Sequence, residues 1–279
     1  MTSVRPEEIR SGARPAALAL RGVAKGFGPR GRRSEVLAGV EFELAPGECV
    51  AVLGFSGSGK TTLLSILAGL LPPDAGSVEM DGAPAPPAGP ERGVVFQSYA
   101  LLPWLTVAGN VQLAVDAVHP ELGRRARRAR TLELVRVVGL EAALEKRPRE
   151  LSGGMRQRVA VARALALEPR ILLLDEPLGA VDALTRSSLQ AEFARLFERS
   201  HKSVVLVTND VDEAILLADR IVPLTPGPRA TLGASFRVAL ARPRDRTWLN
   251  RDPAFKKLRN EITTHLLELS ARRPGRARR

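Results

Sequence analysis

The sequence predicts an α/β protein with a parallel-sheet core, an N-terminal antiparallel β portion and an inserted helical portion. A continuous apolar run at residues 49–53 is typical of a strand buried on both faces. Similar runs at 171–174 and 203–207 alternate with helical stretches, which indicates parallel β-α-β connections. Residues 105–150 are rich in Leu, Ala, Arg and Glu with few β-branched runs, which indicates helices.

The composition is that of a folded protein. Of 279 residues, 44% are apolar and 26% charged, which allows a sizeable core and excludes a wholly disordered or fibrous chain. The single cysteine, Cys49, excludes an intramolecular disulfide and a Cys-rich zinc module. No apolar run reaches the roughly 20 residues of a membrane span, and no apolar stretch follows the first charged residues. We therefore expect no span, no secretion signal and a reduced cytosolic setting.

The chain begins with a polar, charged segment containing two prolines, which we expect to be a flexible basic tail. Within residues 18–53, short apolar runs alternate with turn signals such as Pro46-Gly47, which predicts antiparallel strands. Turn-rich segments at 72–73 and 82–90 predict loops. Helices are expected at 61–71, 155–166, 184–200 and 211–220.

A late amphipathic segment has Ile262, Leu266 and Leu269 at helical spacing, followed by an Arg-rich end. With no internal repeat in the chain, we divide it by these patterns. The expected parts are the tail (1–16), a main domain (17–236) with a helical subdomain at about 98–154, and a basic C-terminal extension (237–279).

The net charge of +12 is concentrated at the ends. Residues 1–33 hold eight Arg or Lys against two Glu, and residues 237–279 hold thirteen against four acidic residues. Basic tails can bind nucleic acid or an anionic membrane surface, or they can simply be solvated. The basic run at 124–130 leaves the same choice between a solvated helix face and a contact with a partner or lipid.

A phosphate-binding loop is predicted at residues 54–61 (GFSGSGKT), between a strand and a helix. Glycines let backbone N–H groups turn toward phosphate oxygens, and the following helix adds its dipole. Lys60 would place its charge on the β- and γ-phosphates, and the Thr61 hydroxyl would bind Mg²⁺. The candidate nucleotide-binding residues here are Gly54, Phe55, Ser56, Gly57, Ser58, Gly59, Lys60, Thr61 and Thr62.

Two carboxylates follow the apolar strand at 171–174. Ligands bind at the carboxyl ends of the strands in doubly wound sheets, so Asp175 can complete the Mg²⁺ shell. Glu176 can orient or deprotonate the attacking water. Without other evidence, Asp175 and Glu176 would be interpreted as solvated acids at a strand end. Together with the phosphate-binding loop, they predict a hydrolytic site.

Further motifs resemble those of the ABC ATPases, in the family's order. Residues 151–158 (LSGGMRQR) are similar to the signature motif, with Met where Gln is commoner. Gln97 lies where the family has its Q-loop, and residues 179–182 (GAVD) resemble the D-loop. Phe27 lies at the place of the aromatic that stacks on adenine. The resemblance covers about residues 18–225 and implies a P-loop ABC ATPase with a RecA-like core that uses ATP and Mg²⁺.

The resemblance also implies a dimer in which two chains enclose two ATP molecules. Ser152, Gly153 and Gly154 of one chain would face the γ-phosphate held by Lys60 of the other. Asp182 would lie at the same interface, and Gln97 would join the Mg²⁺ shell and the catalytic groups. From the residues alone, the serine-glycine run before a helix is an anion site or an ordinary N-cap.

One position departs from the family pattern. Asn209 stands where the switch histidine normally follows a strand, and His201 lies on the other side of that strand. An asparagine NH₂ group can donate a hydrogen bond to the γ-phosphate, but it carries no titratable proton. We therefore expect hydrolysis with Asn209 among the catalytic groups.

Several segments resemble the nitrate/sulfonate/taurine importer branch, among them 101–104 and 211–214. Segments 208–210, 223–228 and 242–246 look most like its nitrate members. The resemblance implies an importer subunit at the cytoplasmic face of a bacterial inner membrane. Nitrate is the first choice for the imported solute, and sulfonate or taurine is the second. The partners of this subunit would be a second ABC ATPase subunit, identical or not, membrane permease subunits, and indirectly an extracytoplasmic solute-binding protein.

The apolar groups at 98–105 are expected either to dock a permease helix, with Trp104 foremost, or to pack in the helical subdomain. Two other functions remain open. A soluble ABC-type ATPase acting on nucleic acid or ribosomes is favoured by the Arg-rich tails, whereas the single ATPase unit weighs against it. A nucleotide-gated clamp would bind ATP with hardly any turnover.

Overall fold

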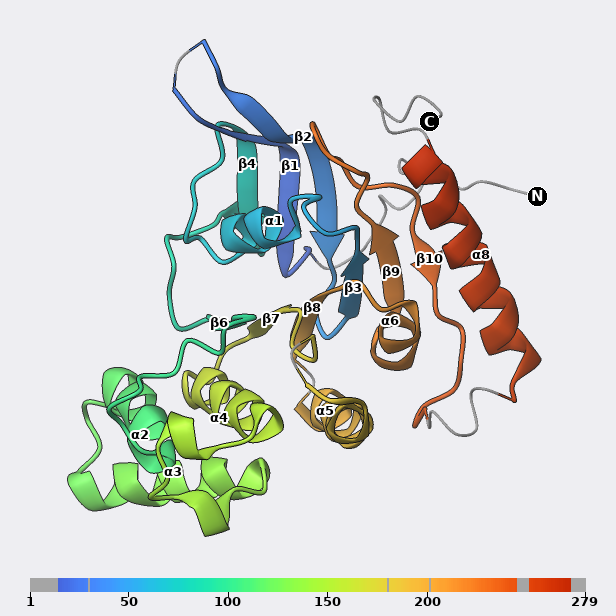
Figure 1. Cartoon of the computed structure of the whole chain (residues 1–279). Coiled ribbons are helices and arrows are strands. Elements are labelled where there is room, and N and C mark those ends of the chain that lie inside the picture. Colours follow the sequence, from blue (N-terminus) through green and yellow to red (C-terminus); the bar gives the residue numbers. More distant parts are fainter. Residues whose placement is uncertain (1–14, 30, 180, 201, 245–250, 272–279) are drawn as a thin grey trace.

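The computed structural model describes residues 15–29, 31–179, 181–200, 202–244 and 251–271, and Figure 1 shows their arrangement. An antiparallel sheet comes first, in the order β2-β1-β4-β5. Its strands are β1 (Leu18–Phe27), β2 (Ser34–Leu44), β4 (Ala75–Met80) and β5 (Ala83–Pro84).

The second sheet is largely parallel, with the order β10-β9-β3-β8-β7-β6. Its neighbours pair in parallel except for β10, which pairs antiparallel with β9. Its strands are β3 (Cys49–Leu53), β6 (Arg92–Val95), β7 (Ile171–Asp175), β8 (Ser203–Thr208), β9 (Arg220–Pro223) and β10 (Phe236–Arg237). The register places Leu53 beside Thr208 and Asp175 beside Val207, so the carboxyl ends of β3, β7 and β8 meet at one edge.

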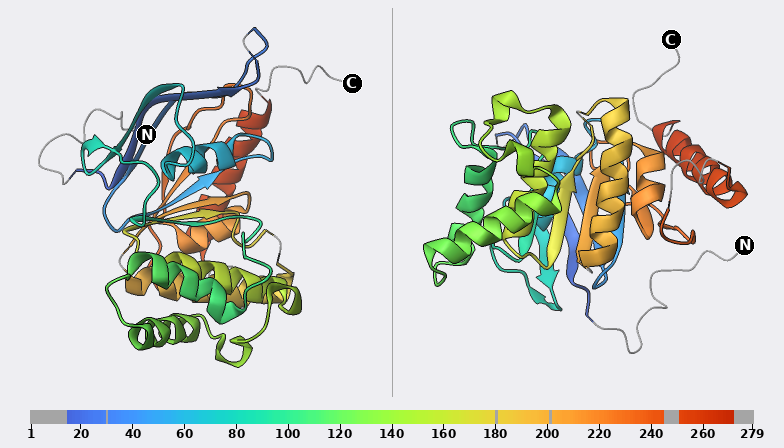
Figure 2. Two further views of the ribbon diagram at one scale, coloured as in Figure 1. Left: turned by 90° about the vertical axis from the view of Figure 1, so that its left-hand side faces the viewer. Right: turned by 90° about the horizontal axis from the view of Figure 1, so that it is seen from below.

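Helices cover both faces of the parallel sheet (Figures 1 and 2). The α-helices are α1 (Lys60–Leu67), α2 (Val107–Val118), α3 (Arg124–Val137), α4 (Gly153–Ala166), α5 (Ala183–Ser200), α6 (Val211–Leu217) and α8 (Pro253–Ala271). Short 3₁₀ turns η2 (Glu141–Ala143) and η3 (Pro148–Glu150) connect α3 to α4. None of the helices in the described segments has the length and apolar character needed to cross a bilayer.

Alternation along the central strands creates two hydrophobic cores. Val50 and Val52 of β3 point into one core, which α1 and the antiparallel sheet complete. Ala51 and Leu53 point into the other, which contains residues of α2 to α6 and of α8. The continuous apolar strand expected at 49–53 is therefore confirmed as one buried on both faces.

Some predicted boundaries are wrong. The helix expected at 211–220 ends at Leu217, and Arg220 begins β9. Ala218 after the helix has an extended backbone, and the Asp219 carboxylate then accepts from the backbone N–H of Cys49 at 2.9 Å. The helix expected at 61–71 runs over Lys60–Leu67, and the loop expected at 82–90 contains β5. The strands β4, β6, β9 and β10 were not predicted.

The C-terminal amphipathic segment forms α8, as predicted. Phe255 and Ile262 are buried, at 3% and 0% exposure, in the core that they share with α6. The Arg259 guanidinium lies 2.9 Å from the Asp212 carboxylate of α6, which adds an ion pair to this packing. The expected basic tail at 1–16 lies outside the described residues except for its last two positions.

Candidate nucleotide-binding site

The predicted phosphate-binding loop connects β3 to α1, in the context that its motif requires. Gly57 and Gly59 have φ angles of +74° and +96°, which favour glycine. Gly54 is required for a different reason, since a Cβ there would lie 2.7 Å from the Ser58 hydroxyl oxygen. That hydroxyl is buried without a hydrogen-bond partner among the described atoms, so the loop holds a polar group that a ligand could satisfy.

Lys60 begins α1 and points back into the loop. Its side chain is only 5% exposed, and its Nζ lies 3.0 Å from the carbonyl oxygens of both Gly54 and Phe55. The Glu176 carboxylate lies 3.2 Å away on the other side. The ammonium group is thus fixed between the loop and the acidic strand end, where it can bind phosphate oxygens.

Thr61 and Asp175 meet from separate elements. The Thr61 hydroxyl donates to Asp175 Oδ2 at 2.9 Å, whereas Oδ1 is buried without a hydrogen-bond partner among the described atoms. Burial raises the pKa of Asp175 above its usual range, against the opposing effect of the Thr61 hydrogen bond. A hydroxyl beside a carboxylate oxygen that lacks a partner is a donor set that suits Mg²⁺.

Glu176 adopts a left-handed backbone conformation, with φ at +43°, directly after β7. Its N–H donates to the carbonyl of Val207 at 2.9 Å, which holds this conformation. The carboxylate lies between Lys60 and Gln97, whose Nε2 donates to Oε2 at 3.2 Å. Four predicted site residues (Lys60, Gln97, Asp175 and Glu176) are therefore brought together at the carboxyl edge of the sheet.

The remaining predicted loop residues line the same turn. Ser56 and Gly57 are exposed, Phe55 is half-buried, and Thr62 is half-buried in the first turn of α1. Phe27, at the end of β1, is 45% exposed, with Lys25 Nζ 5.9 Å from the centre of its ring. An open aromatic face here is available to a ligand.

The serine-glycine run forms the N-terminus of α4. Ser152 is the N-cap and accepts from the N–H of Met155 at 3.3 Å. Within the described part of the chain, no hydrogen bond or ion pair joins residues 152–154 to the phosphate-binding loop. Gly154 packs against α5, and Asp182 accepts from the N–H of Thr185 at 3.0 Å.

Asn209 is exposed at the end of β8. Thr208 before it is buried, and Asp210 after it caps α6 by accepting from the N–H groups of Asp212 and Glu213. Beneath this turn lies a buried pair that the sequence did not predict, in which the Thr208 hydroxyl donates to Glu213 Oε2 at 2.6 Å. Glu213 follows Asp212 in the sequence, and neither its spacing nor its neighbours signal a buried acid.

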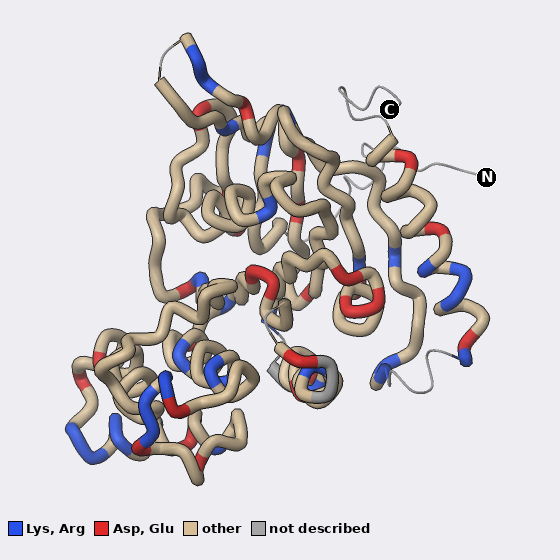
Figure 3. The backbone as a smooth tube through the Cα atoms, viewed as in Figure 1, with Lys and Arg blue, Asp and Glu red and all other residues tan. Residues whose placement is uncertain are grey.

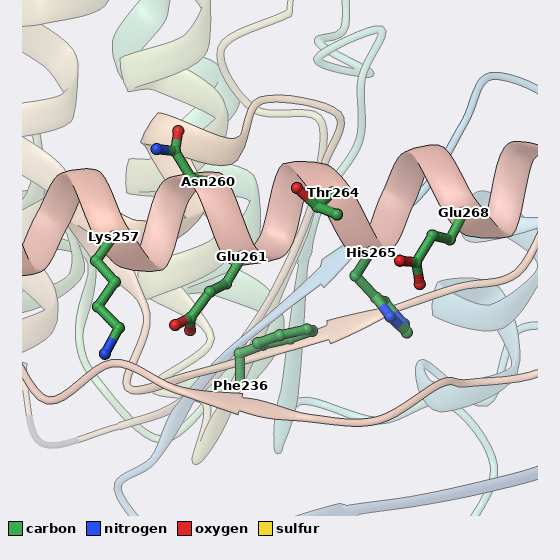
Figure 4. A pocket seen from close by; sticks show the side chains of 7 residues that line it. All are labelled: Phe236, Lys257, Asn260, Glu261, Thr264, His265 and Glu268. Carbon is green, nitrogen blue, oxygen red and sulfur yellow. The ribbon is translucent and has the colours of Figure 1, made fainter.

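A separate hollow of about 670 Å³ lies between α8 and β10 (Figure 4). None of the predicted nucleotide-binding residues lines it. Its side chains carry mixed charges and come from Phe236, Lys257, Asn260, Glu261, Thr264, His265 and Glu268.

Residues 37–179 match the family model described as ABC transporter. The chain belongs to this family. It is 47% identical over 238 residues to the nitrate import ATP-binding protein NrtC of Synechococcus elongatus, covering 85% of this chain and 36% of NrtC. It is 50% identical to the bicarbonate transport ATP-binding protein CmpC of a Synechocystis species, covering 81% of this chain and 34% of CmpC. The nitrate import ATP-binding protein NrtD of Synechococcus elongatus is 45% identical, and the similarity covers 81% of this chain and 83% of NrtD.

The structure of the ATP-binding cassette MJ0796, a dimer in a post-hydrolysis state bound to ADP and Pi, is similar, with a TM-score of 0.71 and 31% identity. That similarity covers 80% of this chain and 100% of MJ0796. The resemblance to ABC ATPases and the α/β fold with a parallel-sheet core are therefore confirmed. The chain spans about a third of the length of NrtC and CmpC. The individual roles of the site residues of this ABC transporter family member stay predictions.

Proposed function

We propose that the chain is the ATP-binding and ATP-hydrolysing subunit of an ABC importer for a small, singly charged oxyanion. The observation that carries this proposal is the meeting of Lys60, Thr61, Asp175 and Glu176 at one sheet edge. A cation, a hydroxyl, a metal-binding carboxylate and a second carboxylate are the groups that hydrolysis of a nucleoside triphosphate requires.

In this proposal, the amides of residues 54–61 and the Lys60 ammonium bind the β- and γ-phosphates. Thr61, Asp175 and Gln97 would hold Mg²⁺, which neutralises phosphate charge when it is bound. Because Lys60 would then turn to the phosphates, the Glu176 carboxylate would be released to accept a proton from water. The NH₂ group of Asn209 would donate a hydrogen bond to the γ-phosphate.

The second half of the site would come from a partner subunit. Ser152 has an extended backbone and is the N-cap of α4, so the N–H groups of this helix terminus other than that of Met155 are available to a phosphate. We propose that residues 152–154 and Asp182 meet the nucleotide held by another ABC subunit, identical or homologous. The dimeric MJ0796 bound to ADP and Pi supports this arrangement.

Permease subunits would supply the channel, and this chain would act from the cytoplasmic face of the inner membrane. Trp104 is 66% exposed, which favours docking over packing in the helical subdomain. Its neighbours Tyr99 and Leu101 instead pack partly buried against the core. The two expectations for segment 98–105 thus apply to different residues.

Nitrate and bicarbonate are the solutes that the names of the relatives favour, with sulfonate or taurine as the third choice from the sequence. Each of the first two is a planar monoanion, so we propose this shared chemistry for the solute. It would be selected by the permease and an extracytoplasmic solute-binding protein. Solute-stimulated ATP hydrolysis by the complex purified from membranes would distinguish these solutes.

The test of ATP binding and hydrolysis uses the full chain with Mg-ATP. Lys60→Ala should weaken nucleotide binding about 10- to 100-fold, because it removes charge-assisted hydrogen bonds to phosphate of about 1.5 to 3 kcal/mol. Lys146→Ala, at an exposed position, is the matched control. Glu176→Gln should abolish phosphate release while nucleotide stays bound. Unchanged affinity in Lys60→Ala would refute the proposal.

The nucleic-acid alternative gains no support from the basic run at 124–130, which opens α3 (Figure 3). Arg127, Arg128 and Arg130 in this run pair with acidic side chains of the same subunit. Phosphate release distinguishes the proposed enzyme from a nucleotide-gated clamp without turnover. If the chain is such a clamp, the wild-type protein should release no more phosphate than the Glu176→Gln variant.

A further inference from the structure

A buried carboxylate supports the turn that presents Asn209. Glu213 is 3% exposed and Thr208 is 2% exposed, and their side chains meet at 2.6 Å. The Thr208 hydroxyl also accepts from the N–H of Asp210 at 3.1 Å. One hydroxyl therefore links a buried acid to the backbone on both sides of Asn209.

This turn is also joined to the predicted hydrolytic carboxylate. Val207, the residue before Thr208, accepts from the N–H of Glu176 at 2.9 Å. Because Glu176 is held in a left-handed conformation by that bond, a shift of the end of β8 would move both Glu176 and Asn209. The position of Thr208 thus affects two groups that would act on the γ-phosphate and the water.

We infer that Glu213 is a positioning residue for ATP hydrolysis: its ionised carboxylate, through Thr208, fixes the turn that carries Asn209, so that turnover depends on its protonation. This inference rests on the proposed function. An ionised acceptor makes a shorter and stronger hydrogen bond than a neutral one, so protonation of Glu213 would loosen the turn.

The surroundings of Glu213 place its titration near neutral pH. Burial raises its pKa to about 7, with Asp210 and Glu176 adding to the rise, while the Thr208 hydrogen bond and Arg186 of α5 oppose it. The strands β3 and β8, which pack against α6, carry no ionisable side chain except Cys49, whose burial keeps its thiol neutral.

From α8, Arg259 faces the same helix but pairs with Asp212. Glu213 Oε1 has no hydrogen-bond partner among the described atoms, so the carboxylate is held through Oε2 alone. Protonation of Glu213 would therefore weaken the one side-chain hydrogen bond that holds its carboxylate among the described residues.

The experiment measures steady-state ATP hydrolysis by the full chain from about pH 5.5 to about pH 9. The wild type should show kcat rising through an ionisation near 7, the value expected for Glu213. Glu213→Gln keeps the side-chain volume and an acceptor for Thr208, so it should fold but lose this step. Its kcat above neutral pH should fall about 10- to 100-fold, with KM for Mg-ATP unchanged, since the residue lies outside the nucleotide contacts.

Two variants at Thr208 give an independent test should Glu213→Gln fail to fold. Thr208→Ser keeps the hydroxyl and should keep the pH step, whereas Thr208→Val should lose it. Glu261→Gln, on the exposed face of α8, is the matched control and should behave as wild type.

The outcomes separate this inference from the proposed function. A wild type that binds and hydrolyses ATP, with Glu213→Gln showing the same pH profile, overturns the inference alone. A change in KM rather than kcat overturns it as well, because the residue would then act on binding. A wild type that neither binds nor hydrolyses ATP refutes the proposed function and this inference together.

Discussion

The substitution Gly154→Ala tests why the serine-glycine run needs its second glycine. Gly154 is in the first turn of α4 and has no positive φ. A Cβ there would lie 2.4 Å from Thr185 Cγ2 on α5, closer than real contacts allow. Such overpacking costs about 1 to 3 kcal/mol, whereas replacing glycine by alanine gains about 0.4 to 1 kcal/mol by restricting the unfolded chain. We expect a net loss of between about 0 and about 2.6 kcal/mol, with a middle value of about 1.3 kcal/mol.

The assay is urea unfolding of four proteins: wild type, Gly154→Ala, Thr185→Ser and the double variant. Thr185→Ser removes the clashing methyl and keeps the backbone N–H that Asp182 accepts. In the double variant, the alanine should therefore become stabilising, which gives a coupling energy of about 1 to 3 kcal/mol. A Gly154→Ala variant more stable than wild type would refute the packing argument. ATP hydrolysis by the double variant then reports on the role of Gly154 at the nucleotide alone.

Three further predictions concern separate parts of the chain. Arg244→Met should lower the free energy of unfolding by about 3 kcal/mol in urea, since the buried guanidinium donates to several backbone carbonyls at the end of α6 and after β10. Asn209→Ala should reduce kcat on the order of 100-fold while nucleotide affinity, measured by titration calorimetry, persists; unchanged turnover would remove Asn209 from the site. The pKa of Asp74 is lowered to about 2, first by the backbone N–H of Gly26 and then by Lys25 and Arg33. Its stabilising effect is present above its ordinary value of 3.8 and is lost as the pH falls toward 2, so Asp74→Asn should flatten the acid-unfolding curve in that window.

The sequence was sufficient for the elements whose local pattern matches their environment. Strands β3, β7 and β8 are apolar throughout or nearly so because both of their faces are buried. The phosphate-binding loop was predictable because its glycine spacing, lysine and threonine occur between such a strand and a helix.

Two strands that begin with an arginine were missed because the partners of each guanidinium come from loops and other elements. Arg92 opens β6 at 3% exposure, and its guanidinium donates to the carbonyls of Leu67, Pro86 and Pro87. Arg220 opens β9 and pairs with Glu48 at 2.7 Å. No local pattern shows that such an arginine has partners, so the sequence of these four-residue strands resembles a polar loop.

Site residues such as Lys60 and Asp175 could be selected from the sequence because the chemical group of each one suits phosphate or metal binding. The buried residues that hold the site in place could not be selected in this way. Glu213 lies four residues after Asn209, and nothing in that spacing shows that its carboxylate turns inward to Thr208. Such contacts depend on how β8 and α6 pack together, which a single sequence does not record.

The burial of Phe255 and Ile262 against α6 has a consequence for natural variation in this family. A relative that ends before α8 would present to water the surface of α6 that these two side chains cover. Relatives without α8 should therefore carry polar residues on that surface. A version of this chain shortened before α8 should self-associate unless the apolar residues of that surface are replaced by polar ones.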